Sequence, residues 1–109
     1  MRKETERPPE VKILPIGKMR QDCTMNGCTG NFWGHVRKNY RSRDKSETWK
    51  IVNDSGIILG YVPEDKVDEL TAFIDDKDFH PCKGHVNRGY DHFKKQYYYY
   101  GECVIEKII

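Results

Sequence analysis

Short apolar stretches alternate with turn-forming residues along most of the chain, a pattern typical of β-strands. Val11–Ile16 predicts the first strand, with Pro15 near its end because proline has no N–H to donate. Residues 17–31, rich in glycine and asparagine, predict a loop or an irregular ribbon. Phe32–Arg37 predicts a second strand, in which we expect Gly34 to form a bulge.

The next apolar stretches predict a β-hairpin, and the end of the chain predicts a long strand. Thr48–Asn53 and Ile57–Val62 flank Asp54-Ser55-Gly56, a sequence suited to a tight turn. Gln96–Ile109 predicts the long strand, and it contains the consecutive tyrosines Tyr97–Tyr100. Because successive side chains of a strand point to opposite faces, at most half of these tyrosines can face one ligand.

A single helix interrupts this series of strands, and it begins at Pro63. Acidic residues crowd its first turns, where the helix dipole favours anions. Its apolar residues recur at helical spacing and predict one buried face: Val67, Leu70, Phe73 and Ile74. The pattern fails around residues 75–78. The elements together predict a mainly β fold, a small OB- or SH3-like β-barrel of about six strands with one main α-helix inserted after Pro63.

Length and composition restrict the class of protein. The 109 residues fit one domain, and enzymes built on large barrels or two-lobed nucleotide-binding folds need more chain. Residues 1–10 are charged and contain prolines, which predicts a disordered tail before a single domain at 11–109. No apolar run is long enough for a membrane span and no signal-peptide pattern opens the chain. We therefore expect a cytoplasmic protein, or a nuclear one if the source is eukaryotic, with reduced cysteines and no membrane partner.

The net charge of +2 hides a strong separation of charge along the chain. Residues 35–50 contain six basic and two acidic groups, a net charge of +4. Residues 64–78 contain seven acidic and two basic groups, a net charge of −5. A local basic field attracts phosphates whatever the total charge is.

Aromatic residues are interleaved with the basic ones in two places. The first run extends from His35 to Trp49, and the second from Lys83 through Tyr90 to Tyr97–Tyr100. Basic side chains hold a phosphate backbone and aromatic rings stack on unpaired bases, so two such runs on a small barrel favour single-strand nucleic-acid binding. The alternative is a solvated loop followed by a strand whose alternate tyrosines belong to the core.

The cysteine and histidine residues raise two other kinds of chemistry, metal binding and catalysis. Paired short spacings of soft ligands suggest a zinc site as an alternative, formed by Cys23, Cys28, Cys82 and His85. Small free cysteines are also routinely buried as apolar side chains, in which case the protein has neither metal nor cofactor. No P-loop, G-x-S-x-G or H-E-x-x-H motif is present, so we expect no catalytic residue and no enzyme.

Three motifs follow one another within residues 37–64: RKNYRSRD at 37–44, WKIV at 49–52 and IILGYVP at 57–63. Their order and spacing resemble the HIRAN domain family, in which a basic residue opens a short loop, a strand and a glycine turn follow, and Gly-Tyr/His-Val/Leu-Pro precedes a helix. The resemblance implies an OB-like barrel that binds single-stranded DNA, including its 3′ end, in DNA repair or replication-fork handling. It also implies a separate helicase-like ATPase or nuclease as a partner.

The resemblance and the charge pattern together assign roles to seven residues. Asp44 matches the family's motif aspartate, which accepts a hydrogen bond from the terminal hydroxyl, and Tyr61 matches the Gly-Tyr position beside it. The phosphates would be held by Arg37, Lys38 and Arg43, and the bases would stack on Tyr40, Tyr61 and Tyr90. The alternative function is a non-enzymatic, protein-interaction or regulatory barrel, with or without zinc, that uses an exposed strand edge or the acidic helix.

Overall fold

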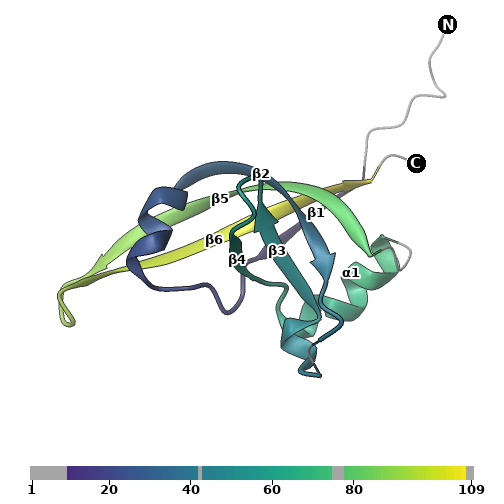
Figure 1. The fold of residues 1–109 in the computed structure, drawn as a ribbon, viewed down its shortest axis with the longest axis horizontal. Helices are drawn as coiled ribbons and strands as arrows, with labels where there is room; N and C mark the ends of the chain where they lie inside the picture. The colour runs from purple at the N-terminus through teal and green to yellow at the C-terminus, as the bar shows by residue number, and fades with distance from the viewer. Residues whose placement is uncertain (1–9, 42, 75–77, 108–109) are drawn as a thin grey trace, which may run out of the picture.

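The computed structural model describes residues 10–41, 43–74 and 78–107 of the chain. Six antiparallel strands form one sheet that curls into a half-barrel (Figure 1). Its spatial order is β1-β6-β5-β2-β3-β4. The strands are β1 (Glu10–Pro15), β2 (Gly30–Lys38), β3 (Trp49–Asn53), β4 (Ile58–Tyr61), β5 (Phe79–Asp91) and β6 (Gln96–Lys107). The expected mainly β, barrel-like fold is confirmed.

The curl brings the two edges of the sheet together. Directly after β1, Gly17 and Tyr61 exchange two backbone hydrogen bonds, each with an N···O distance of 2.7 Å. Tyr61 belongs to β4, the strand at the opposite edge of the sheet. This bridge satisfies backbone groups that would otherwise face solvent as an unpaired edge.

The helix begins where the sequence places it. After Pro63, a 3₁₀ turn η4 (Glu64–Lys66) leads into α1 (Val67–Phe73). Val67, Leu70 and Ile74 are buried and Phe73 packs against them at the edge of the core, as the helical spacing predicts. Residues 75–77, where the pattern fails, lie outside the described residues.

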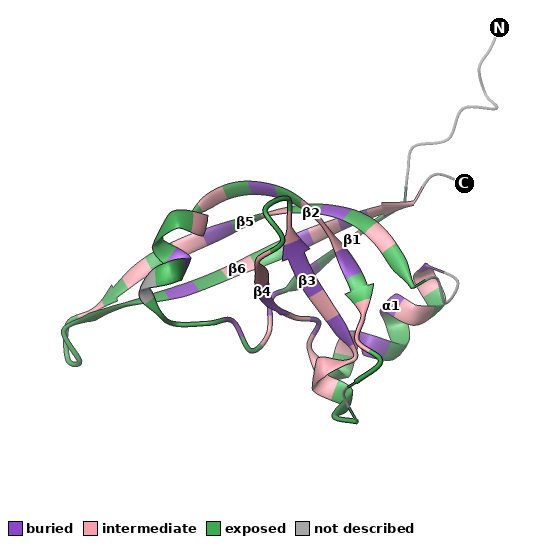
Figure 2. Ribbon diagram, viewed as in Figure 1, coloured by how far each residue is buried: buried purple, intermediate pink, exposed green. Residues whose placement is uncertain are grey.

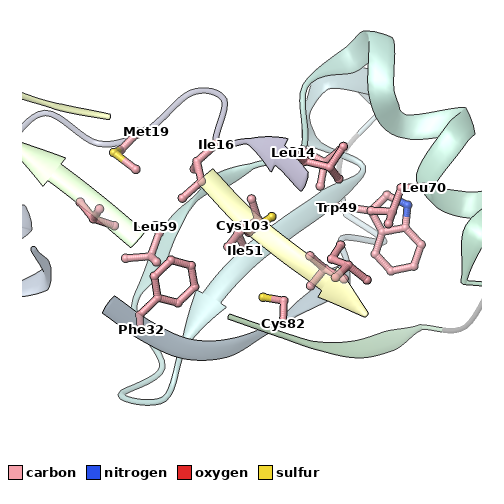
Figure 3. Close-up of a cluster of buried hydrophobic side chains, with 14 of the residues drawn as sticks. Leu14, Ile16, Met19, Phe32, Trp49, Ile51, Leu59, Leu70, Cys82 and Cys103 are labelled. Carbon is pink, nitrogen blue, oxygen red and sulfur yellow. The ribbon is translucent and has the colours of Figure 1, made fainter. Parts of the chain in front are cut away.

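Alternating side chains of the sheet fill its concave side. Figure 3 shows Trp49, Ile51, Leu14, Leu59 and Leu70 in this cluster, together with the buried thiols of Cys82 and Cys103. Two further 3₁₀ turns complete the chain, η2 (Cys23–Cys28) and η3 (Lys45–Glu47). In η2, Met25 is fully buried, so part of the segment expected to be a loop is ordered around a core side chain.

Two details of the strands differ from the sequence prediction. Gly34 forms no bulge, because the pairing of β2 with β5 runs through it without a shift and the pairing of β2 with β3 begins at it in regular register. Glycine is needed there for another reason: a Cβ would lie 1.9 Å from the carbonyl oxygen of Val52. The irregularity in register lies instead between Ile51 and Val52, where β3 pairs with β4.

The strand that the sequence did not indicate is β5. It contains Pro81 and two glycines and has few β-branched residues, so its propensity for a strand is low. Pro81 is tolerated because β5 pairs only with β2 at that point, and its ladder with β6 begins at Lys83.

The remaining boundaries match closely. β1 begins at Glu10, one residue before the expected start, and residues 1–9 of the expected tail lie outside the described residues. β6 follows the predicted last strand up to Lys107, beyond which the chain is again outside the described part. Among the described residues, no helix has the length and apolar character that a bilayer span requires.

Candidate nucleic-acid interface

The end of β2 opens into a shallow hollow of about 300 Å³, which we call the basic hollow. Residues from β2, from the turn after it, from β3 and from the start of β5 form its walls. They are Arg37, Lys38, Asn39, Tyr40, Arg41, Lys50 and Asp78. Four of these seven side chains are cationic, so the hollow gathers much of the basic segment found in the sequence.

Backbone hydrogen bonds fix the geometry of this hollow. Lys38 N–H donates to the carbonyl of Asp78 at 2.9 Å, and Asn39 N–H donates to that of Thr48 at 2.8 Å. Arg37 is paired with Lys50 on β3, and directly paired residues of a sheet point to the same face. Arg37 and Lys50 therefore present two cations side by side on the outer face of the sheet.

Lys38 occupies a different position from its neighbours. Its ammonium lies 5.6 Å from the ring centroid of Trp49. Trp49 is fully buried, and its Nε1–H donates to the hydroxyl of Thr71 at 3.1 Å. Lys38 is thus half-buried, and its ammonium is a cation–π partner of a core ring. It is therefore less accessible to a ligand in the hollow than the exposed cations are.

Tyr40 stands at the rim of the basic hollow. Its hydroxyl donates a hydrogen bond to the carboxylate of Asp78, which raises the pKa of the tyrosine. The hydroxyl is anchored while 72% of the residue is exposed to solvent. An anchored, exposed ring of this kind offers a face on which a base can stack.

The outward cations of the hollow form no ion pair with any described residue, although the carboxylate of Asp78 stands in the same wall. The cations that form ion pairs within the described part of the chain are Lys12, Lys18, Arg20, Lys45 and Lys83. Arg37, Arg41 and Lys50 take part in none of them. Their charges are therefore available to an external anion.

Asp44 is engaged by its own neighbours. Its Oδ1 accepts from the N–H and hydroxyl of Ser46 at 2.9 and 2.7 Å, which caps η3, and its Oδ2 accepts from Lys18 Nζ at 3.0 Å. These bonds, chiefly those from Ser46, lower the pKa of Asp44 to about 2. A ligand hydroxyl at Asp44 would therefore compete with these partners.

The other expected site residues lie at different distances from the basic hollow. Arg43 is exposed next to Asp44. Tyr61 is half-buried on β4, where it pairs with Lys50 and so lies beside the hollow on the same face of the sheet. Tyr90 lies near the far end of β5 from Phe79, which is the partner of Arg37. Tyr90 follows Phe79 by eleven positions, which corresponds to about 36 Å along a strand. The structure does not bring Tyr90 to the basic hollow.

The structure also separates the expected zinc ligands. Cys82 and His85 lie three residues apart on one strand, so they point to opposite faces of β5. Cys82 is buried in the core, where burial raises its pKa to about 12. His85 is exposed, and its Nδ1 is hydrogen-bonded to Oδ1 of Asn31 at 2.8 Å. Cys28 is half-buried on η2, and the side chain of Cys23 lies outside the described part. The described side chains form no cluster of three metal-ligating groups.

The site set predicted from the sequence omitted four residues of the hollow: Asn39, Arg41, Lys50 and Asp78. Arg41 belongs to the basic segment 35–50 that the sequence indicates. Lys50 could have been found, since alternation along Thr48–Asn53 places it on the opposite face from Trp49 and Ile51. Asp78 could not, because its contact with Tyr40 spans 38 positions of sequence and depends on the unrecognised strand β5.

Compared with protein-family models, curated proteins and solved structures, the chain has no significant match. The similarity of residues 37–64 to the HIRAN family therefore stays a prediction.

Proposed function

We propose that this protein is a binding module that holds single-stranded DNA through phosphate contacts at the basic hollow. One observation carries the proposal: the outward cations of Arg37, Arg41 and Lys50 converge on one hollow and form no ion pair with any described residue. Unneutralised cations at one site favour a polyanion, because each phosphate contact releases condensed counterions.

Tyr40 favours an unpaired strand over a duplex. Its exposed ring stands beside the cations, and unpaired bases can stack on such a ring whereas bases inside a duplex cannot. Recognition of the 3′ end of the strand is a more specific part of the proposal. It requires the terminal hydroxyl to donate to Asp44 in competition with Ser46 and Lys18.

The test compares two charge-matched triple variants by anisotropy titration of a labelled ten-nucleotide strand. The test variant is R37A/R41A/K50A, which spares Lys38 because that side chain packs on Trp49. The control is K12A/K45A/K66A, which removes three cations beside the acidic helix, where Lys12 and Lys45 pair with Glu69 and Asp68. Both changes lower the net charge equally.

We expect the test variant to bind at least tenfold more weakly in low salt, with a salt dependence reduced by up to about 2 in log–log slope, from about 0.7 for each lost phosphate contact. The control variant should retain most of the affinity. Equal losses in both variants would show that total charge, and not the basic hollow, determines binding.

A further inference from the structure

The outer face of the sheet carries a row of exposed aromatic side chains that the proposed phosphate contacts do not use. Directly paired residues identify this face: Arg37 pairs with Phe79, Trp33 with Lys83, Asn87 with Tyr100, and Gly89 with Tyr98. The four aromatic residues of the row are Trp33 (65% exposed), Phe79 (52%), Tyr98 (45%) and Tyr100 (51%). We call this row the outer aromatic track.

At one end, the track lies on the arm formed by residues 87–100 of β5 and β6. Figure 1 shows this arm projecting past the rest of the sheet, and Figure 2 shows that most of it is exposed. Tyr98 and Tyr100 stand two positions apart, with ring centroids at 5.8 Å and ring planes within 28° of parallel. Two nearly parallel rings on a strand form a platform of the kind on which bases stack.

The backbone of Gly89 makes this arrangement possible. A Cβ at Gly89 would lie 2.3 Å from Cζ of Tyr98 and 2.5 Å from its hydroxyl oxygen. The ring of Tyr98 therefore lies flat against the neighbouring strand, where a larger residue would exclude it. On the opposite face of the arm, Tyr90 and Tyr97 pack edge to face at 5.1 Å, and Arg88 covers Tyr97.

Trp33 occupies the middle of the track. The Lys83 ammonium lies 5.6 Å from its ring centroid, which places a cation beside an exposed indole. Two hollows, of about 370 and 750 Å³, border this pair and share Trp33, Lys83 and Val104 in their walls. Both hollows are large enough to receive a base next to the indole.

The track leads into the basic hollow. From Trp33 the outward side chains of β2 continue through His35, whose ring lies 4.5 Å from that of Phe79, to Arg37. Acidic groups lie on both sides of the track: on β6, Glu106 is 3.7 Å from Lys83 and Glu102 pairs with His85, and Asp54 lines the larger hollow beside Trp33. The cations of Arg37 and Lys50 lie together at the end of β2, so a phosphate backbone would run towards them.

We infer that single-stranded DNA crosses the outer face of the sheet, with its bases stacked on Tyr98, Tyr100 and Trp33 and its phosphates leading to the basic hollow. This inference rests on the proposed function and specifies its ligand, an unpaired strand recognised by stacking. It also assigns stacking to Tyr98 and Tyr100, in place of Tyr90, which lies on the opposite face of the same arm.

Tryptophan fluorescence tests the track directly. The two tryptophans differ, since Trp49 is fully buried and Trp33 is exposed, so quenching by a short ligand reports on Trp33. We would titrate the protein with ten-nucleotide oligothymidylate and with an abasic deoxyribose-phosphate strand of equal length. The thymidylate strand should quench the emission. The abasic strand should bind more weakly and leave the emission unchanged, and Trp33→Phe should abolish the quenching.

A second experiment compares the two faces of the arm formed by residues 87–100. Tyr98→Ala/Tyr100→Ala should weaken oligothymidylate binding at least fivefold, the smallest effect usual for loss of one base–aromatic stack. The matched control Tyr90→Ala/Tyr97→Ala should bind like the wild type. Equal effects of the two double variants, or strand binding without quenching of Trp33, would contradict base stacking on the outer aromatic track. Neither result would contradict phosphate binding at the basic hollow. Quenching with full affinity in R37A/R41A/K50A would instead overturn the proposed function, and no binding by the wild type would overturn both.

Discussion

Gln21 and Tyr99 lie 78 positions apart and are joined by two hydrogen bonds: Gln21 Nε2 donates to the carbonyl of Tyr99 at 2.8 Å, and Tyr99 N–H donates to Gln21 Oε1 at 2.6 Å. This part of β6 lies beyond the end of β1, which pairs no further than Glu102. The amide side chain therefore takes the place of a neighbouring strand. It fixes β6 where the exposed arm begins.

Replacing this amide should destabilise the protein. Gln21→Ala removes both partners of a partly buried backbone unit, so we expect a loss of about 1–3 kcal/mol in the free energy of unfolding. Urea denaturation followed by circular dichroism measures it. Gln96→Ala, at an exposed position of the same strand, is the control and should change stability little. A Gln21→Ala protein as stable as this control would show that water replaces the amide at no cost.

Gly89→Ala should move the ring of Tyr98 without unfolding the core. The added Cβ requires the ring to leave the backbone of β5, because the two would lie 2.3 Å apart. We expect the variant to unfold within about 1 kcal/mol of the wild type, since the arm is exposed, and to bind oligothymidylate as weakly as Tyr98→Ala. Gly27→Ala, where an added Cβ meets nothing within 4 Å, should leave binding unchanged. Unchanged binding by Gly89→Ala would contradict the stacking role of Tyr98.

The lowered pKa of Asp44 predicts that the stability of the protein decreases at acidic pH. Its folded-state pKa of about 2 lies below the ordinary value of 3.8, so the unfolded chain binds the proton more readily. The stabilisation by the ionised carboxylate is complete above about pH 4 and is lost as the pH falls through about 2. We expect the wild type to exceed Asp44→Asn in melting temperature at pH 5. The difference should shrink between pH 4 and 2. A difference that does not change with pH would assign the effect to capping alone.

The buried thiols should be unreactive in the folded protein. Burial raises the pKa of Cys82 to about 12, and that of Cys103 is raised for the same reason. Because the thiolate is the reactive form, Cys23→Ser/Cys28→Ser should not react with a disulfide reagent at pH 8 until urea exposes both remaining thiols. Rapid reaction of the native variant would mean that the inner face of the sheet opens readily.

The sequence indicated most of the fold because most elements carry their own local signal. The β3–β4 hairpin has a turn sequence between two apolar stretches, and α1 has apolar residues at helical spacing after Pro63. The strand β5 carries no such signal, since Pro81 and its glycines suggest a loop. Its position between β2 and β6 follows from pairing across the sheet, which no local pattern records.

The contrast between local sequence signals and pairing across the sheet also explains which site residues could be predicted. Arg37, Lys38 and Tyr40 are close in sequence and meet in one hollow. Tyr90 was grouped with them by composition alone, and only the direction of β5 shows that it lies at the far end of the sheet. Trp33 could have been recognised by alternation between the inward Phe32 and Val36, but the two runs of basic and aromatic residues that the sequence indicates begin at His35 and Lys83 and do not include it.

Binding of single-stranded DNA at the basic hollow is best tested by one titration: the anisotropy of a labelled ten-nucleotide single strand, with either a 3′-hydroxyl or a 3′-phosphate, at two salt concentrations. We expect measurable binding in low salt that weakens as salt rises, with a log–log slope of about −2 for three phosphate contacts. Preference for the hydroxyl end would place that end at Asp44, and equal affinities would limit recognition to the strand itself. Absence of binding to either strand in low salt would show that this protein does not bind single-stranded DNA.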